Sequence, residues 1–235
     1  MNTKIQMICA WCGLAYVIVL VIALSIAGIL PAHSPTFNSF DVAAIFQADP
    51  FHIRLGLLIA MWATMLFILF SAVISVQMSH IEGRFPVLSW AQLVAAAGAA
   101  LSIELPIMFW EATAFRPERL ADSTQLLDDL ANTLWAGMTV PFLLQPICIA
   151  IVGFMDKSKH PVFPKWACIF NLITALMILP GGFTIFFKTG PLAWDGIFTL
   201  YAPFVVWISW FSTMTYLLIK AIKMQAKSEM AERTA

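Results

Sequence analysis

Six long apolar runs follow one another along this chain of 235 residues, separated by short polar segments. The runs cover residues 5–30, 53–78, 87–114, 130–155, 164–187 and 197–222. A helix needs about 20 mostly apolar residues to cross the hydrocarbon core of a bilayer. Every run is long enough, and none alternates between apolar and polar residues as the strands of a membrane barrel do. The sequence therefore predicts an all-α membrane protein, a bundle of six transmembrane helices.

The apolar runs leave no room for a separate soluble domain. Hydrophobic residues make up 61% of the chain and charged residues 11%, too little polar surface to cover a soluble protein of this size. We therefore expect one six-span transmembrane domain at residues 1–222 and a cytoplasmic tail at 223–235. The first run is too long for the apolar part of a signal peptide, so it is predicted to stay as a helix.

Lysine and arginine residues are distributed unevenly between the segments that join the runs. If the N-terminus is inside, the inner segments hold nine of them and the outer segments hold four, Arg54, Arg116, Arg119 and Lys188. Short cytoplasmic segments carry an excess of lysine and arginine. The sequence thus predicts a multi-pass protein of the inner (plasma) membrane with both termini in the cytoplasm. Nine of the 13 acidic residues show the opposite preference and lie towards the outer side.

Two outer segments are predicted to contain short amphipathic helices. The first is residues 39–47, where apolar side chains recur at helical spacing and favour a helix on the membrane surface. In the second, leucines including Leu126 and Leu130 recur on one face, which leaves Asp128 and Asn132 to face water or a cavity. We expect this second helix to lead into the fourth span.

Two glutamates stand in the third apolar run. At 1.5 Å per residue, Glu104 lies about 24 Å and Glu111 about 34 Å along the helix, against a hydrocarbon thickness of about 30 Å. Their spacing of seven residues puts both on one helix face. A carboxylate at this depth normally faces the bundle interior, where it finds a partner or takes up a proton. We predict that Glu104 binds a ligand, ion or proton, with a structural hydrogen bond to Gln145 or Asn171 as the alternative.

Charged and aromatic residues gather at the predicted outer rim of the bundle. They are Trp110, Glu111, Arg116, Trp135, Lys188, Trp194 and Asp195. An ion pair of Glu111 with Arg116 or Lys188 is one simple explanation, and an aromatic belt at the interface explains the tryptophans without any ligand. Their combination at one rim nevertheless indicates a site there.

Several chemistries find no support in the sequence. The four histidines lie in loops or at helix ends, which excludes haem ligation or a di-metal centre at membrane depth. Cys9 and Cys12 have the spacing of a redox pair, but they fall in the first turns of a membrane helix and are predicted to be packing residues. We expect no metal, no cofactor and no nucleic-acid partner.

These observations favour a small inner-membrane transport or binding protein surrounded by lipid. Its cavity would open to the outer side and take a cation, a proton or an amphipathic organic ligand, attracted by the acidic outer surface. The predicted lining is Glu104, Glu111, Trp110 and Gln145, under loops that carry Arg116, Lys188, Trp194 and Asp195.

Two other functions remain open. The protein is alternatively a membrane-embedded enzyme that acts on a lipid or another hydrophobic substrate, with Glu104 or Glu111 as the acid–base group. It is alternatively an accessory subunit that packs against a larger complex or against copies of itself. The small residues at 95–100 permit the close helix approach that such packing needs.

Overall fold

Helices are the regular secondary structure of the part of the chain that the structure describes. The computed structural model describes residues 3–234, with side chains up to residue 231, and contains no strand in that range. Six helical segments are long and apolar enough to cross a membrane: Thr3–Ile26, Pro50–Glu82, Val87–Phe115, Ala121–Met155, Lys165–Phe186 and Ile197–Ala231. The prediction of an all-α chain with six membrane-spanning segments is confirmed at this level.

Three of the six segments are single unbroken helices and three are interrupted. The unbroken ones are α1 (Thr3–Ile26), α3 (Pro50–Glu82) and α4 (Val87–Phe115). The interrupted ones pair α5 (Ala121–Gly137) with α6 (Val140–Met155), α7 (Lys165–Ile178) with the 3₁₀-helix η1 (Leu179–Phe186), and the π-helix η2 (Ile197–Tyr201) with α8 (Ala202–Thr234). The fourth apolar run is therefore broken at Met138 and Thr139 instead of forming one helix over 130–155.

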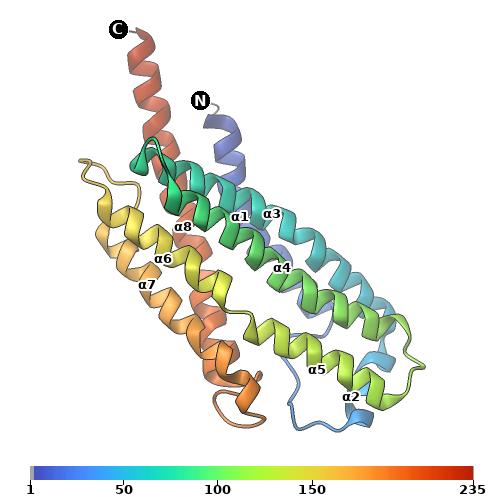
Figure 1. Ribbon diagram of the computed structural model, residues 1–235. Coiled ribbons are helices and arrows are strands. Elements are labelled where there is room, and N and C mark those ends of the chain that lie inside the picture. The colour runs from blue at the N-terminus through green and yellow to red at the C-terminus, as the bar shows by residue number, and fades with distance from the viewer. Residues whose placement is uncertain (1–2, 235) are drawn as a thin grey trace.

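Both termini lie at the same end of the bundle (Figure 1). The short helix α2 (Ser39–Ala48) and α5 lie at the opposite end, which we call the distal end and which is formed by residues 27–49, 116–139 and 187–196. An even number of spans requires termini on one side of the membrane. Which side they face stays a prediction from the lysine and arginine distribution.

Small residues allow the unbroken helices to approach closely. A Cβ atom at Gly56 of α3 would lie 2.4 Å from the carbonyl oxygen of Ala23 in α1, so only glycine fits there. The alanines within residues 95–100 of α4 are mostly buried inside the chain, and Gly98 faces Pro141 of α6. This stretch is therefore used for packing within the protein and gives no separate argument for an oligomer.

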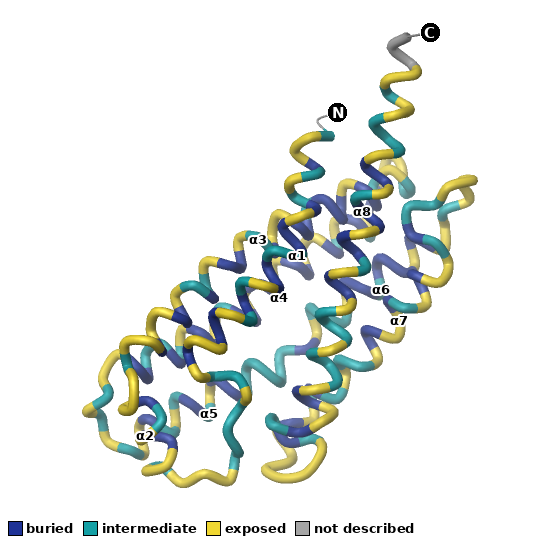
Figure 2. Tube along the Cα trace, turned by 180° about the vertical axis from the view of Figure 1, so that it is seen from behind, coloured by how far each residue is buried: buried dark blue, intermediate teal, exposed yellow. Residues whose placement is uncertain are grey.

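An aromatic cluster fixes α8 against α1 and α3. The Tyr16 ring stacks on Phe67 at a centroid distance of 5.4 Å, and Phe211 contacts both Tyr16 and Trp207. Buried residues follow the inner faces of all these helices, while the outward faces are exposed (Figure 2). The core thus lies between the helices, and apolar side chains on the outside meet lipid.

The segment predicted as a tail continues the last helix. Helix α8 runs to Thr234 and extends past the other helices at the terminal end (Figure 1). Gln77 of α3 donates one hydrogen bond to Gln225 of α8 at 3.2 Å and another to Gln6 of α1 at 2.8 Å. These buried amides join three helices near the termini.

Side-chain caps define both ends of the connection from α2 to α3. Asn38 accepts hydrogen bonds from the backbone N–H groups of Phe40 and Asp41, and Asp41 accepts in return from the Asn38 N–H. Asp49 separates the helices and caps α3. The backbone N–H of His52 donates to this carboxylate and holds the pKa of Asp49 below its ordinary value of 3.8, helped by the His52 side chain.

Helix α5 turns its polar face inwards. Asp128 is 0% exposed and Asn132 is 5% exposed, whereas Leu126 is 62% exposed. In a bilayer the apolar face of a helix is solvated by lipid, and polar groups must find partners within the protein. The face that would meet water in a soluble protein is therefore the one that packs against α4 and α2.

Candidate functional site

The main cavity lies where the interrupted segments meet. Its volume is about 120 Å³, and it reaches the α5–α6 break at Met138 and Thr139. It also reaches Gly181 of η1 and Thr199 of η2. Three segments of irregular backbone thus border one cavity, and the unbroken helices α1 and α4 complete its wall.

Aromatic, aliphatic and hydroxyl side chains line the cavity. The aromatic residues are Trp135, Phe142, Phe204 and Trp207, and the hydroxyl residues are Ser102, Thr139 and Thr199. The remaining lining residues are Leu20, Ile103, Ala136, Met138, Ile178, Gly181, Leu200 and Pro203, and none of the lining residues is charged. The cavity is consequently suited to an apolar or weakly polar organic molecule.

The local sequence explains why the backbone is irregular around the cavity. Pro141 stands in the first turn of α6, where its missing N–H is tolerated, and Pro180 stands at the start of η1. A Cβ atom at Gly181 would lie 2.6 Å from the carbonyl oxygen of Ala136. Glycine at this position lets η1 pack directly on the end of α5 and close one side of the cavity.

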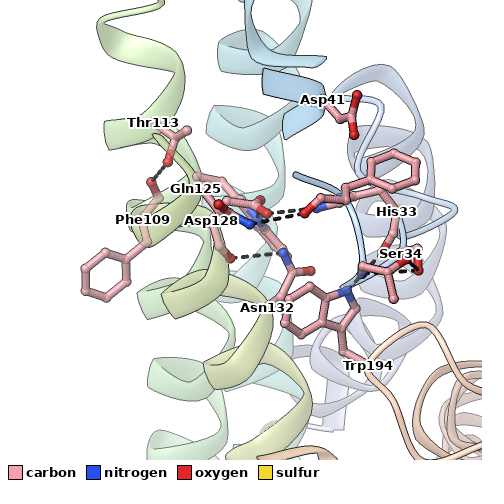
Figure 3. A network of polar contacts seen from close by, with 12 residues as sticks. His33, Ser34, Asp41, Phe109, Thr113, Gln125, Asp128, Asn132 and Trp194 are labelled. Carbon is pink, nitrogen blue, oxygen red and sulfur yellow. Dashed lines mark hydrogen bonds and ion pairs between the residues drawn. The ribbon is translucent and has the colours of Figure 1, made fainter. Parts of the chain in front are cut away.

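A buried polar network lies on the distal side of the cavity (Figure 3). The Asp128 carboxylate contacts His33 Nε2 at 2.8 Å and accepts a hydrogen bond from Trp110 Nε1 at 3.1 Å. Asn132 donates its side-chain amide to the backbone carbonyl of Asp128 at 3.0 Å. A fully buried carboxylate is therefore held by two ring nitrogens that come from α4 and from the segment after α1.

The same network fastens residues 31–37 to the rest of the protein. Trp194 Nε1 donates to the His33 carbonyl at 2.9 Å, and Gln125 donates to the Phe37 carbonyl at 3.1 Å. Both donors come from distant parts of the sequence, as Figure 3 shows. The connection between α1 and α2 is thus fixed as a cover across the distal end, which we call the distal cover.

Two tryptophans connect this network to the cavity. The Trp110 ring, which binds Asp128, packs against the Trp135 ring at a centroid distance of 5.6 Å. A second, much smaller pocket of about 10 Å³ lies between the network and the cavity. Trp135 and Leu200 line both spaces, so these two side chains separate the main cavity from the distal end.

Glu104 does not line the cavity and has a partner in α3. Thr64 Oγ1 donates to its carboxylate at 2.5 Å, and neither Gln145 nor Asn171 forms a hydrogen bond with it among the described residues. Glu104 thus forms a structural hydrogen bond, but its partner is Thr64 of α3 and not Gln145 of α6 or Asn171 of α7. Sequence spacing gives the depth of Glu104 but not the rotation of α4 that turns this residue towards Thr64.

The two amides that were considered as partners of Glu104 are used elsewhere. Gln145 accepts a hydrogen bond from Gln92 at 3.3 Å, and Gln92 in turn accepts one from Ser75, which connects α6, α4 and α3. Asn171 accepts from Trp210 Nε1 at 2.8 Å. Both amides join helices. Gln145 was predicted to line the cavity, but it is absent from the lining.

The charged residues of the predicted rim are not brought together. Glu111 is half-buried, while Arg116 and Lys188 are exposed, and no ion pair joins them within the described residues. Lys188 does lie near enough to Asp129 for an electrostatic attraction. Asp195 is half-buried, and like Glu111 it is absent from the cavity lining.

The three tryptophans of the rim lie inside the protein and do not form a belt towards lipid. Trp110 is 1% exposed, and Trp135 and Trp194 are half-buried. Each has a specific role, in the Asp128 contact, the cavity wall or the distal cover respectively. Of the predicted site residues, Trp110 and Trp194 are the ones that belong to the polar network.

Metal and thiol chemistry gain no geometric support. Among residues 3–231, whose side chains are described, no group of three histidine, cysteine or acidic side chains is placed to hold a metal ion. Cys9 and Cys12 are free thiols. The arrangement therefore offers binding, and its one contact between an imidazole and a fully buried carboxylate among the described residues joins His33 to Asp128.

The sequence reasoning missed His33 and Asp128 as a pair, together with the hydroxyl residues of the cavity. One signal was available: Pro180, Gly181 and Gly182 interrupt an apolar run, and interrupted spans mark binding sites in membrane transporters. No comparable signal joins His33 to Asp128, because they stand in different segments. Comparison with known proteins adds nothing to the site, since no protein-family profile, no curated protein and no solved structure matches the chain.

Proposed function

We propose that this chain is a small membrane-embedded transport or binding protein whose cavity takes a small, mainly apolar organic molecule. It resides in the inner membrane with both termini in the cytoplasm, which puts the distal end and the distal cover outside. The lysine and arginine distribution supports this orientation.

The observation that carries the proposal is the convergence of the α5–α6 break, η1 and η2 on one cavity. Irregular backbone at membrane depth is tolerated where it lines a cavity, and transporters place their substrates at such breaks. An engineered apolar cavity of about 150 Å³ stays dry and binds benzene. A volume of about 120 Å³ therefore suits a molecule of about that size.

The chemistry of the lining favours one of the ligands that the sequence left open. A cation or a proton needs a carboxylate or another acceptor of charge, and the cavity contains none. The enzyme alternative needs an acid–base group beside the substrate, and neither Glu104 nor Glu111 lines the cavity. An organic ligand is the option of the three that fits the walls.

Transport in this arrangement requires the distal closure to open. Trp135 and Leu200 close the cavity on that side, and the Asp128 network holds Trp110 against Trp135. A ligand that leaves towards the distal end must displace these side chains. The contact of His33 with the buried Asp128 is thus the one that has to break.

Photolabelling tests the binding step. The full chain in liposomes is irradiated with increasing 3-trifluoromethyl-3-phenyldiazirine, and labelled residues are identified by mass spectrometry. We expect saturable labelling at Trp135 and Phe142, in addition to non-saturable labelling of lipid-facing residues. Labelling without any saturable part at these residues would contradict the proposal.

A filled cavity supplies the matched control. Ala136 lines the cavity, and Ala136→Leu puts three further carbon atoms into it. Ala97 is exposed on the lipid-facing side of α4, so Ala97→Leu makes the same chemical change outside the site. We expect Ala136→Leu to remove the saturable labelling and Ala97→Leu to keep it. Equal labelling of both variants would show that the probe binds elsewhere.

A further inference from the structure

The hydroxyl group of Thr199 is the one fully buried side-chain polar atom of the described cavity lining that lacks a partner. Thr199 is 7% exposed, and its Oγ1 has no hydrogen-bond partner among the described residues. Other described hydroxyls share this property, but of that group only Thr199 lines the cavity. Burial of a hydroxyl without a hydrogen-bond partner costs free energy. A case of this kind in a folded protein therefore requires an explanation.

The local backbone explains why Thr199 cannot satisfy itself. Some helical threonines of this protein donate to the carbonyl four residues earlier, as Thr113 does to Phe109 at 2.8 Å and Thr174 does to Phe170 at 2.9 Å. Thr199 stands only two residues after the start of η2, so that acceptor is missing. The Gly196 carbonyl already accepts the N–H groups of Thr199 and Leu200. The hydroxyl consequently has no acceptor in its own helix.

Of the two other hydroxyl residues at the cavity, Ser102 already has a partner, whereas Thr139 has no side-chain hydrogen bond among the described residues and is only less completely buried. Ser102 Oγ donates to the Gly98 carbonyl of its own helix at 2.9 Å. A charged ligand would have no partner of opposite charge in the lining, and an unpaired charge at membrane depth is costly. These facts restrict the ligand to uncharged molecules with a hydrogen-bonding atom.

We infer that the cavity binds an uncharged ring compound that carries a hydroxyl or carbonyl oxygen, and that this oxygen accepts a hydrogen bond from Thr199 Oγ1. The ring packs among Trp135, Phe142 and Trp207. This inference rests on the proposed binding function and adds the chemical class of the ligand. Thr199 is accordingly a specificity-determining residue.

The test compares two probes that differ by one hydroxyl group, 4-fluorophenol and fluorobenzene, both uncharged at pH 7. Binding to the full chain in micelles is followed by ¹⁹F NMR in wild type, Thr199→Val and Thr174→Val. Partition of a probe into the micelle cancels when the same probe is compared between variants. Thr174 is a matched control because it is also buried but does not line the cavity.

We expect Thr199→Val to weaken 4-fluorophenol binding about fivefold, the size of one net hydrogen bond, and to leave fluorobenzene binding unchanged. Thr174→Val should change neither probe. 4-Fluorobenzoate, which is charged at pH 7, should bind at least tenfold more weakly than 4-fluorophenol. Thermal unfolding of each variant, followed by circular dichroism, shows whether the fold is retained.

The possible failures are distinguishable. If fluorobenzene binds saturably but 4-fluorophenol binding is insensitive to Thr199→Val, the ligand class is wrong and the binding function stands. If 4-fluorobenzoate binds as tightly as 4-fluorophenol, the requirement for an uncharged ligand is wrong. If no probe binds saturably to the wild type, both the ligand class and the proposed function are wrong.

Discussion

Helices α1, α3 and α4 run unbroken for 24, 33 and 29 residues, whereas every span formed by the rest of the chain is interrupted. In the unbroken half, backbone hydrogen bonds are made within each helix and stability depends on close approach, as at Gly56. In the interrupted half, the segments enclose a cavity and depend on side-chain contacts between distant segments. Within one membrane domain, the regular half is suited to support and the irregular half to binding.

The acidic residues of the two halves show the same contrast. Glu104 of α4 is partly exposed and bonds Thr64 of the neighbouring helix. Asp128 of α5 is fully buried and joins α4 to the distal cover through Trp110 and His33. Removal of each acid should therefore have different consequences.

Loss of the Asp128 carboxylate should destabilise the protein most. Asp128→Ala leaves the Trp110 N–H and His33 without their buried partner, and removal of one member of a buried pair costs about 3–5 kcal/mol. SDS unfolding in mixed micelles, followed by circular dichroism, measures the change. In a double-mutant cycle with His33→Ala we expect non-additive effects, because both changes remove the same contact. Additive effects would show that the two side chains do not interact.

Close packing in the unbroken half is tested at Gly56. A Cβ atom there meets backbone atoms of Ala23 and Ala27, which cannot rotate away, so we expect Gly56→Ala to cost about 2–3 kcal/mol. Gly137, the last residue of α5, has free space around it and serves as the control. Gly137→Ala should change the free energy of unfolding by less than about 1 kcal/mol. Similar costs at both positions would remove the distinction between the halves.

The bond between Thr64 and Glu104 should matter for stability and not for the ligand. Thr64→Val removes one donor to the carboxylate and should cost about 1–2 kcal/mol in the same unfolding assay. Neither Thr64→Val nor Glu104→Gln should alter saturable photolabelling of the cavity, because neither residue lines it. Loss of labelling in Glu104→Gln would restore the sequence-based proposal that this carboxylate couples to binding.

The smallest effect is expected at the exposed cap of α3, where pH provides the control. Because the pKa of Asp49 is lowered in the folded protein, the charged cap stabilises the helix start above the ordinary carboxyl pKa. That contribution is lost as pH falls through the lowered pKa. Asp49→Asn still caps but does not titrate. Amide exchange at His52 should therefore accelerate in wild type relative to the variant below pH 4, and equal ratios at all pH values would contradict this.

The extent of the six spans follows from the sequence because it depends on local composition. The length of an apolar run against the thickness of the bilayer decides whether a helix can cross, and no tertiary contact is needed. The predicted run 87–114 and the helix Val87–Phe115 agree almost residue for residue. The breaks are also encoded locally, by Pro141 and by Pro180 with two glycines, although the sequence reasoning did not use them.

Which polar side chains meet was decided by the tertiary structure alone. The apolar runs fix the depth of Glu104 and Asp128, but a partner depends on the rotation of each helix and on the path of the loops. The leucine face of α5 is exposed to lipid, so Asp128 on the opposite face points into the protein, where it contacts His33. In the sequence, His33 stands in an ordinary loop segment. The cavity likewise exists only where three irregular segments come together, because no one of them encloses a space by itself.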